Sequence, residues 1–373
     1  MEKRKLLINF VYCNPVGHVV EALKFAKGFY DANKNLEIHL ILNERSPVEL
    51  AKSCDWIKKV YSINTFDFLR NKTNYSFFDK INKNWDYILA DFRAFDEKEE
   101  PDLGKFHEKA KLFFNAKEYY GNIWDESKYP STLKYIPDSK VTLSIPKKSL
   151  EYSIKYKHRG EKIAIMLAGS AESKEYPTIK TWEKIINSIQ KKIPNSKIYL
   201  TGIRKAAKGR TSTEAYSQNE LRELLKIKDV EDCYDIGLWN QLALIKQCDV
   251  FIAPHTGFAF LAPCVGTPWL AISRGDWHEY IFNRVPFYSI LPDVKDYPRY
   301  ASKMKLKLKK GEKIPEMKPG KLDKKIPEII KGINLLQNKS FTYQKALAFH
   351  IRKIKESSTI KSAYFSFDDV LKL

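Results

Sequence analysis

The chain has 373 residues, of which 43% are hydrophobic and 29% are charged, a globular balance that excludes a collagen-like, a disulfide-scaffold or a wholly disordered protein. This length is about twice that at which one hydrophobic core is the usual solution, so we expect two domains. The formal net charge of +20 at pH 7 predicts attraction to polyanions and bears little on the fold.

The first residues predict a buried strand and not a targeting segment. The apolar run that begins at Leu6 ends at Val11, and no small-residue cleavage site follows it. No stretch of the chain approaches the roughly 18 to 20 apolar residues of a membrane span. The cysteines stand singly and form no C-x-x-C pair, which argues for free thiols in a reducing compartment and against structural zinc. We therefore expect a cytoplasmic protein.

In the first half, apolar runs of strand length alternate with amphipathic stretches of helical length, the pattern of a parallel sheet covered by helices. The predicted elements are strands at 6–11, 36–42 and 87–90, a helix at 17–29, and a weaker candidate strand at 111–115. This rhythm is lost over residues 116–160, which contain several prolines and end in a basic stretch. We place the interdomain linker there.

The second half repeats the alternation more clearly and predicts a Rossmann-like sheet, so the fold class is α/β. The predicted strands are 163–167, 197–201, 250–253 and 269–273, and the predicted helices are 181–192, 217–225, 240–247 and 259–265. The pattern weakens after Pro298, and 341–355 reads as a last helix. We predict an N-terminal domain at 1–155, a C-terminal domain at 156–335, and a helical segment at 336–373, for which packing back on the N-terminal domain is one option.

The positive charge is concentrated in part between Lys303 and Lys331. There, lysines alternate with apolar residues, which indicates an extended segment with one basic face. A solvated surface is one interpretation, and peripheral attraction to an anionic membrane or a charged glycan is the other, since each basic residue near such a membrane contributes about 1 kcal/mol. Nucleic acid is not expected as a partner, because no recognised nucleic-acid module accompanies the charge.

The segment from Cys248 to Pro268 is the most informative part of the sequence. A buried strand runs into a polar turn, His255-Thr256-Gly257, that opens a helix. Unpaired backbone N–H groups and the positive helix end then point to the carboxyl edge of the sheet, where open α/β sheets bind ligands. A nucleotide diphosphate suits this turn, because Thr256 can donate its hydroxyl and Gly257 allows close backbone approach. The alternative is a tight turn with a threonine N-cap and no ligand.

Here the sequence resembles glycosyltransferase family 9, the ADP-heptose:lipopolysaccharide heptosyltransferases. The chain matches the family pattern at Thr256, Gly257, Gly266 and Pro268. It departs from that pattern by placing His255 where the family has aspartate and Phe260 where the family has histidine.

A second match runs from Leu167 to Pro177 and is followed by Trp182. It has the family's order of a strand, a small-residue loop, a lysine, an aromatic residue, a proline and a tryptophan on the next helix. The resemblance implies that Ser170 and Lys174 lie at the donor phosphates, where an ammonium group can neutralise a departing diphosphate. Arg204, after the next predicted strand, is a candidate second cation or else a surface residue.

The third match, Asn14 to Glu21, follows the first predicted strand. Gly17 fits the family's glycine, and His18 stands at the aspartate that is taken to deprotonate the acceptor hydroxyl. A histidine can do this work, since its unperturbed pKa of ~6.5 leaves an accepting imidazole at neutral pH. A hydrogen bond to a nearby carbonyl or phosphate is the alternative role. Glu21 and Asp91 are the reserve bases, although Asp91 is equally suited to cap a strand end.

Together these matches imply a GT-B glycosyltransferase, in which two Rossmann-like domains face each other across a cleft. The resemblance implies a nucleotide-diphosphate sugar as donor and a hydroxyl of a glycan, a lipid-linked glycan or another acceptor. We expect inversion at the anomeric carbon, no cofactor beyond the donor, and no metal, because no histidine–carboxylate spacing suggests a metal site. A nucleotide-sugar epimerase on the same fold, or a non-catalytic nucleotide- or carbohydrate-binding protein, remains the alternative.

Overall fold

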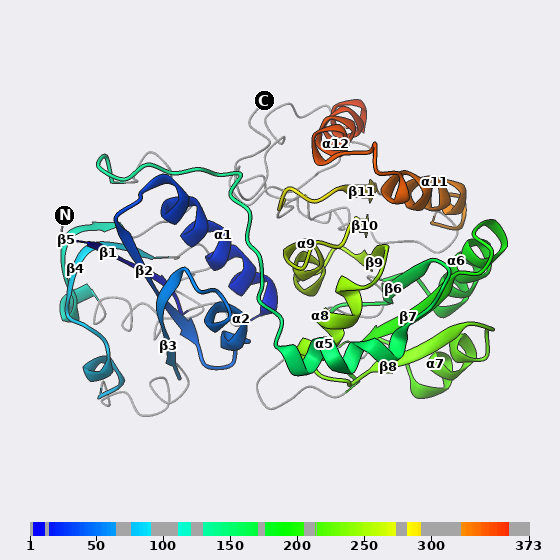
Figure 1. Ribbon diagram of the computed structural model, residues 1–373, viewed down its shortest axis with the longest axis horizontal. Helices are drawn as coiled ribbons and strands as arrows, with labels where there is room; N and C mark the ends of the chain where they lie inside the picture. Colours follow the sequence, from blue (N-terminus) through cyan, green and yellow to red (C-terminus); the bar gives the residue numbers. More distant parts are fainter. Residues whose placement is uncertain are drawn as a thin grey trace, which may run out of the picture. The chain divides into compact units, whose positions relative to one another are not determined.

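The computed structural model describes residues 3–11, 15–64, 76–90, 111–120, 130–170, 176–204, 213, 215–273, 282–291 and 322–357. The chain divides into two compact units, Met1–Leu143 and Ser144–Leu373. Each unit is built on one parallel sheet with helices against it (Figure 1). No helix in the described part of the chain is long and apolar enough to cross a membrane.

The sheet of the first unit has the strand order β3-β2-β1-β4-β5, and every neighbouring pair in it is parallel. Its strands are β1 (Arg4–Phe10), β2 (Leu36–Asn43), β3 (Ile57–Ile63), β4 (Asn84–Ala90) and β5 (Asn115–Tyr120). The helices are α1 (Val16–Ala32), α2 (Val48–Lys52) and the 3₁₀ turn η1 (Ser76–Lys80). Strand order reverses between β1 and β4, so the carboxyl ends of these strands mark the ligand edge of this sheet.

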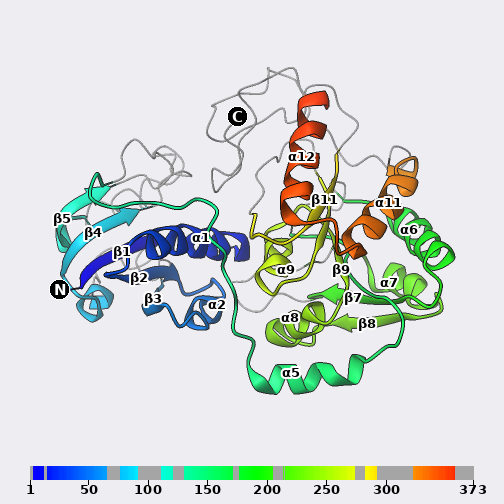
Figure 2. The same ribbon diagram turned by 45° about the horizontal axis from the view of Figure 1, so that its top comes forward.

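The segment 130–143 packs along α1, and both ribbon views show it passing over this helix (Figure 2). A Cβ atom on Gly28 would lie 2.3 Å from the ring of Tyr135, so only glycine allows this close approach. Lys24, a buried residue of α1, donates to the backbone carbonyl of Ser139. These contacts fix the last part of the first unit against its first helix.

The sheet of the second unit has the order β11-β10-β9-β6-β7-β8. Read from β8 to β11 and numbered within the unit, this order is 3-2-1-4-5-6, the order of Rossmann folds. The strands are β6 (Lys162–Met166), β7 (Lys197–Gly202), β8 (Val230–Tyr234), β9 (Val250–Pro254), β10 (Trp269–Ile272) and β11 (Phe287–Ile290). The helical elements are α5 (Lys147–Ser153), η3 (Ile154–Tyr156), α6 (Ile179–Lys192), α7 (Gln218–Leu225), α8 (Leu238–Lys246), η5 (Gly257–Phe260), α9 (Leu261–Cys264), α11 (Ile326–Gln337) and α12 (Tyr343–Ser357).

Most predicted elements are confirmed, but the strand expected at 111–115 is wrong. Residues 111–113 are helical, and strand β5 begins at Asn115. Pattern reading also missed β3, β8, β11, α5 and α11. The helix expected at 341–355 is present as α12, which packs on β11 of its own unit through Phe349 and Tyr288, whose ring centroids are 5.3 Å apart. The alternating lysine stretch that begins at Lys303 lies outside the described residues.

Candidate functional site

The strand order of the second unit places the turn at 255–257 at its topological switch point. Strands β6 and β9 are neighbours, paired from Ile163 with Val250 to Ile165 with Ile252. Chain connections leave these two central strands in opposite directions, and the crevice at their carboxyl ends is where such sheets bind ligands. Strand β9 ends at Pro254 and η5 begins at Gly257, so the predicted turn lies at this edge.

Thr256 is the residue of this edge that points most directly to a bound ligand. It is only 7% exposed, and its Oγ1 atom has no hydrogen-bond partner. It is the N-cap of η5, yet its hydroxyl does not cap the helix. Leaving a buried hydroxyl unsatisfied costs about 1–3 kcal/mol. A ligand oxygen placed at the start of η5 would satisfy this hydroxyl.

Gly169, which pattern reading did not single out, forms the other wall of the turn. A Cβ atom at this position would lie 2.5 Å from Cγ2 of Thr256 and 2.8 Å from the hydroxyl of Tyr176. The loop after β6 therefore touches the loop after β9 at a point where no side chain fits. Ser170, the next residue, is exposed. Lys174, the predicted cation of this loop, lies outside the described residues.

Trp182 holds the base of this loop. It is fully buried on α6, and its indole N–H lies 3.1 Å from the carbonyl oxygen of Leu167, to which it donates, and 3.2 Å from the hydroxyl of Tyr216. Tyr216 also donates to the carbonyl of Pro177, and burial raises the pKa of its hydroxyl. The tryptophan of the predicted motif is thus a core residue that positions the end of β6.

His255 and Phe260, the two departures from the family pattern, touch each other. Their ring centroids are 5.5 Å apart in an edge-to-face arrangement, and the ring of His255 also packs against Trp269 at 5.8 Å. His255 is fully buried, and its backbone N–H donates to the carbonyl of Ile272. Its ring therefore packs with the aromatic side chains beneath the turn, and contact of His255 with the donor stays a prediction.

Arg204, the candidate second cation, is engaged by two carboxylates. Its guanidinium donates to Asp235 at 3.0 Å and to Asp232 at 2.5 Å, and it lies over the ring of Tyr234. Burial works to lower the pKa of Arg204, but the hydrogen bonds and charges of the two aspartates outweigh it, so the pKa is raised. The side chain links the carboxyl ends of β7 and β8 and is already neutralised there.

In the first unit, His18 and Glu21 form a close pair in the first turns of α1. The Nδ1 atom of His18 lies 2.6 Å from Oε2 of Glu21. The carboxylate side chain is 5% exposed, whereas the imidazole is 28% exposed. Gly17, between the loop and the pair, is buried. A carboxylate that accepts from Nδ1–H leaves Nε2 as the accepting nitrogen.

Two buried asparagines hold the backbone of Val11, just after β1, and pattern reading missed both. The side-chain carbonyl of Asn9 accepts from the backbone N–H of Val11 at 3.2 Å, and the side-chain amide of Asn43 donates to the carbonyl of Val11 at 3.2 Å. The sequence signal that could have identified them is an asparagine near the carboxyl end of an apolar strand, in β1 and in β2. Asp91, the second reserve base, lies outside the described residues. Among the residues that are described, no three His, Cys, Asp or Glu side chains gather in a way that would hold a metal ion.

Comparisons with known proteins agree with this architecture. Residues 124–276 match the family model of glycosyltransferase family 9 (heptosyltransferase). No curated protein matches the chain significantly by sequence.

Solved structures resemble most of the chain in fold. A glycosyl transferase family 9 structure from Veillonella parvula is 12% identical, with a TM-score of 0.58 over 90% of this chain and 97% of that one. The E. coli ADP-heptose lps heptosyltransferase II is 10% identical, with a TM-score of 0.52 over 88% and 98%. The E. coli heptosyltransferase WaaC with ADP-2-deoxy-2-fluoro heptose is 11% identical, with a TM-score of 0.50 over 79% and 94%. At these identities the likeness shows a GT-B fold, and residues 124–276 of the chain are similar to glycosyltransferase family 9 (heptosyltransferase).

Proposed function

We propose that this chain transfers a sugar from a nucleotide-diphosphate sugar to a hydroxyl group of a glycan, a lipid-linked glycan or another acceptor. The second unit binds the donor at the carboxyl ends of β6 and β9. The first unit supplies the base, His18. Transfer proceeds by one displacement, so the configuration at the anomeric carbon is inverted.

The buried hydroxyl of Thr256 is the observation that carries this proposal. Its oxygen is desolvated without a partner, and Gly169 keeps the neighbouring loop free of a side chain. The first N–H groups of a helix have no partner within the helix, and they attract an anion. A diphosphate at the start of η5 would accept from the threonine hydroxyl and from these amides together.

The His18–Glu21 pair explains how the acceptor is activated. As the acceptor oxygen bonds to the anomeric carbon, its proton passes to Nε2 of His18 and the bond from that carbon to the diphosphate oxygen breaks. Glu21 accepts from Nδ1–H, holds the ring in the required tautomer and stabilises the imidazolium that forms. Charge develops on the leaving diphosphate, where Thr256, the helix start and Lys174 stabilise it.

Replacing Thr256 with valine tests the donor site. Valine keeps the shape of threonine and removes the hydroxyl, so we expect the affinity for the nucleotide-diphosphate donor to fall by about tenfold, as for one charge-assisted hydrogen bond. Stability should not fall, because the lost hydroxyl has no partner in the unliganded chain. Isothermal titration with ADP, UDP, GDP and TDP sugars measures the donor affinity and identifies the nucleotide base of the donor.

Thr267→Val is the matched control for this experiment. The hydroxyl of Thr267 is also buried, but it donates to the carbonyl of Ile245 at 2.8 Å. This variant should lose about 1 kcal/mol of unfolding free energy and keep its donor affinity. Equal donor affinity in Thr256→Val and in the natural chain would remove the turn at 255–257 from the donor site.

Transfer is expected to need no metal ion. An ammonium group and helix N–H groups can stabilise a departing diphosphate without a divalent cation. Turnover of the identified donor by chain purified without added metal should therefore be the same with and without EDTA. Loss of turnover in EDTA that added Mg²⁺ or Mn²⁺ restores would contradict metal independence and leave the donor site of the proposal intact.

A further inference from the structure

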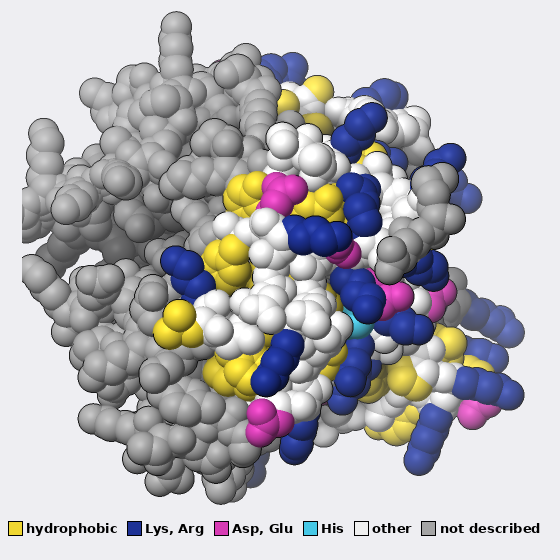
Figure 3. All heavy atoms as spheres, turned by 90° about the vertical axis from the view of Figure 1, so that its left-hand side faces the viewer, with side chains coloured by type: hydrophobic (Ala, Val, Ile, Leu, Met, Phe, Trp, Pro, Cys, Tyr) yellow, Lys and Arg dark blue, Asp and Glu magenta, His cyan; other side chains and the backbone are white. Residues whose placement is uncertain are grey.

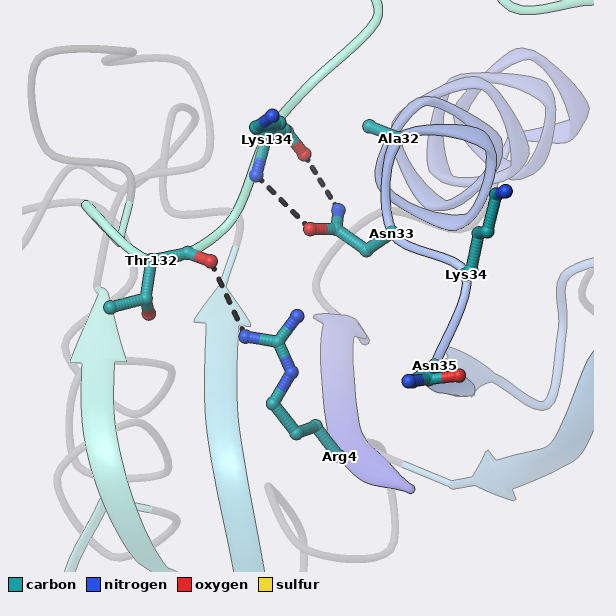
Figure 4. Close-up of a pocket in the computed structure, with 7 residues that line it drawn as sticks. All are labelled: Arg4, Ala32, Asn33, Lys34, Asn35, Thr132 and Lys134. Carbon is teal, nitrogen blue, oxygen red and sulfur yellow. Dashed lines mark hydrogen bonds between the residues drawn. The ribbon is translucent and has the colours of Figure 1, made fainter. Parts of the chain in front are cut away.

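Several basic residues lie together at the amino-terminal edge of the first sheet, the edge opposite the carboxyl end of β1. A pocket of about 440 Å³ opens there (Figure 4). Its volume is within the range of small-molecule sites, roughly 300–1,000 Å³. The polar residues that line it are Arg4, Asn33, Lys34, Asn35, Thr132 and Lys134.

Three cations and no carboxylate line this pocket. Within the described residues, neither Lys34 nor Lys134 forms an ion pair. The guanidinium of Arg4 donates only to neutral oxygens, the Tyr87 hydroxyl at 3.0 Å and the Thr132 carbonyl at 3.3 Å. Positive charges held near one another repel, and a bound anion relieves that repulsion.

The surrounding acidic side chains are already engaged. Asp31 pairs with Lys27 at 2.5 Å, and Asp86 pairs with Lys117 at 2.6 Å. Glu118 accepts from two neutral hydroxyls, that of Tyr120 at 2.5 Å and that of Thr132, a residue of the pocket, at 3.1 Å. The face that contains the amino end of β1 and β5 shows many more Lys and Arg than Asp and Glu side chains (Figure 3). The local field therefore favours an anion in the pocket.

Hydrogen bonds hold the walls of the pocket in place before any ligand arrives. The side-chain amide of Asn33 donates to the carbonyl of Lys134 at 2.8 Å, and its oxygen accepts from the backbone N–H of Lys134 at 3.2 Å. The same amide donates to the carbonyl of Phe29 at 2.7 Å. The C-terminal carbonyls of a helix repel anions. The bond from Asn33 satisfies the carbonyl of Phe29, which is one of these carbonyls in the last turn of α1.

Arg4 provides the oriented donor of the site. One Nη atom is held by Tyr87 and Thr132, and Figure 4 shows the other directed toward Asn33 across the pocket. Lys34, just after the end of α1, and Lys134, on the segment 130–143, also line the pocket. A fixed guanidinium with two flexible ammonium groups suits a dianion with several oxygens better than a single carboxylate. We propose that this pocket binds a phosphate group, at a site separate from the donor site of the proposed function.

Titration with glycerol 3-phosphate and sedimentation with phosphatidylcholine vesicles, with and without phosphatidic acid, test this proposal on the full chain. Arg4→Gln is expected to weaken phosphate binding by about tenfold, and Lys34→Gln with Lys134→Gln to weaken it by a similar factor. Lys148→Gln, which removes the charge of an exposed lysine on α5, is the matched control and should bind as the natural chain does. Thermal unfolding followed by circular dichroism verifies that each variant is folded.

The two probes distinguish the sources of the phosphate. If the pocket variants lose binding to the vesicles that contain phosphatidic acid, the pocket is assigned to a lipid headgroup, whether or not they also lose binding of glycerol 3-phosphate. If they lose only the binding of glycerol 3-phosphate, the pocket is assigned to a free phosphate ester. Unchanged binding of both probes, or an equal loss in Lys148→Gln, overturns the proposal. Nucleoside-diphosphate affinity should be the same in all of these variants, so this test does not depend on the donor site.

Discussion

Replacing His18 with alanine is expected to lower kcat by about 10²–10⁴-fold, the usual contribution of a general base. The imidazole lies in the first turns of α1, 2.6 Å from Glu21, and it is the more exposed member of that pair. Alanine removes the proton acceptor and leaves the helix able to form. Steady-state transfer assays with the donor that titration identifies measure the effect.

Two comparisons make the His18 experiment specific. The donor affinity of His18→Ala should equal that of the natural chain, because His18 and the turn at 255–257 belong to different units. Glu21→Gln should reduce kcat by about tenfold, since glutamine keeps an accepting oxygen but loses the charge that stabilises the imidazolium. A His18→Ala variant with natural kcat would rule out His18 as the base and direct attention to Asp91.

Replacing Trp182 with alanine is expected to reduce the free energy of unfolding by about 3–5 kcal/mol. The side chain is fully buried on α6, so truncation leaves a large cavity. It also removes the hydrogen bond to the carbonyl of Leu167, at the end of β6 where the loop to Gly169 begins. Urea unfolding followed by circular dichroism gives the free energy, and a fall in Tm of roughly 10 °C is expected for a unit of this size.

Trp182→Phe separates packing from hydrogen bonding. Phenylalanine fills most of the space but has no N–H group, so a loss of only about 1–3 kcal/mol is expected. Because the carbonyl of Leu167 begins the loop whose Gly169 approaches Thr256, and loses one of its two donors, Trp182 and Tyr216, the phenylalanine variant should also bind the donor of the proposed function more weakly. A loss of less than 1 kcal/mol in Trp182→Ala would show that the described packing around α6 is wrong.

The elements that were predicted share one physical property. Strands β1, β2, β6, β7 and β9 are buried in the middle of parallel sheets, so they read as nearly continuous apolar runs. Edge strand β8 (VEDCY) carries charges on its exposed positions, and β11 spans four residues. Neither produces a run that stands out from its surroundings. Helix α11 was missed because it follows directly on the lysine-rich tract.

The polar turn at 255–257 and the His18–Glu21 pair were readable because each depends on residues close together in the chain. A strand followed by Thr-Gly predicts a helix start, and a three-residue spacing puts two side chains on one helix face. The roles of Arg204 and His255 were not readable in the same way. Two aspartates from the end of β8 engage Arg204, and aromatic rings enclose His255.

By itself, the sequence determined the α/β class, the two sheets, the turn at 255–257 and the helix that begins near His18, because buried strands and helix starts leave local patterns. Only the tertiary structure decided that Gly169 touches Thr256, that Asn33 links to Lys134, and that Arg4 faces a pocket free of carboxylates. These contacts join residues that are distant in the chain. Strand order brings them together, and strand order results from packing the whole sheet, which no local stretch of residues specifies.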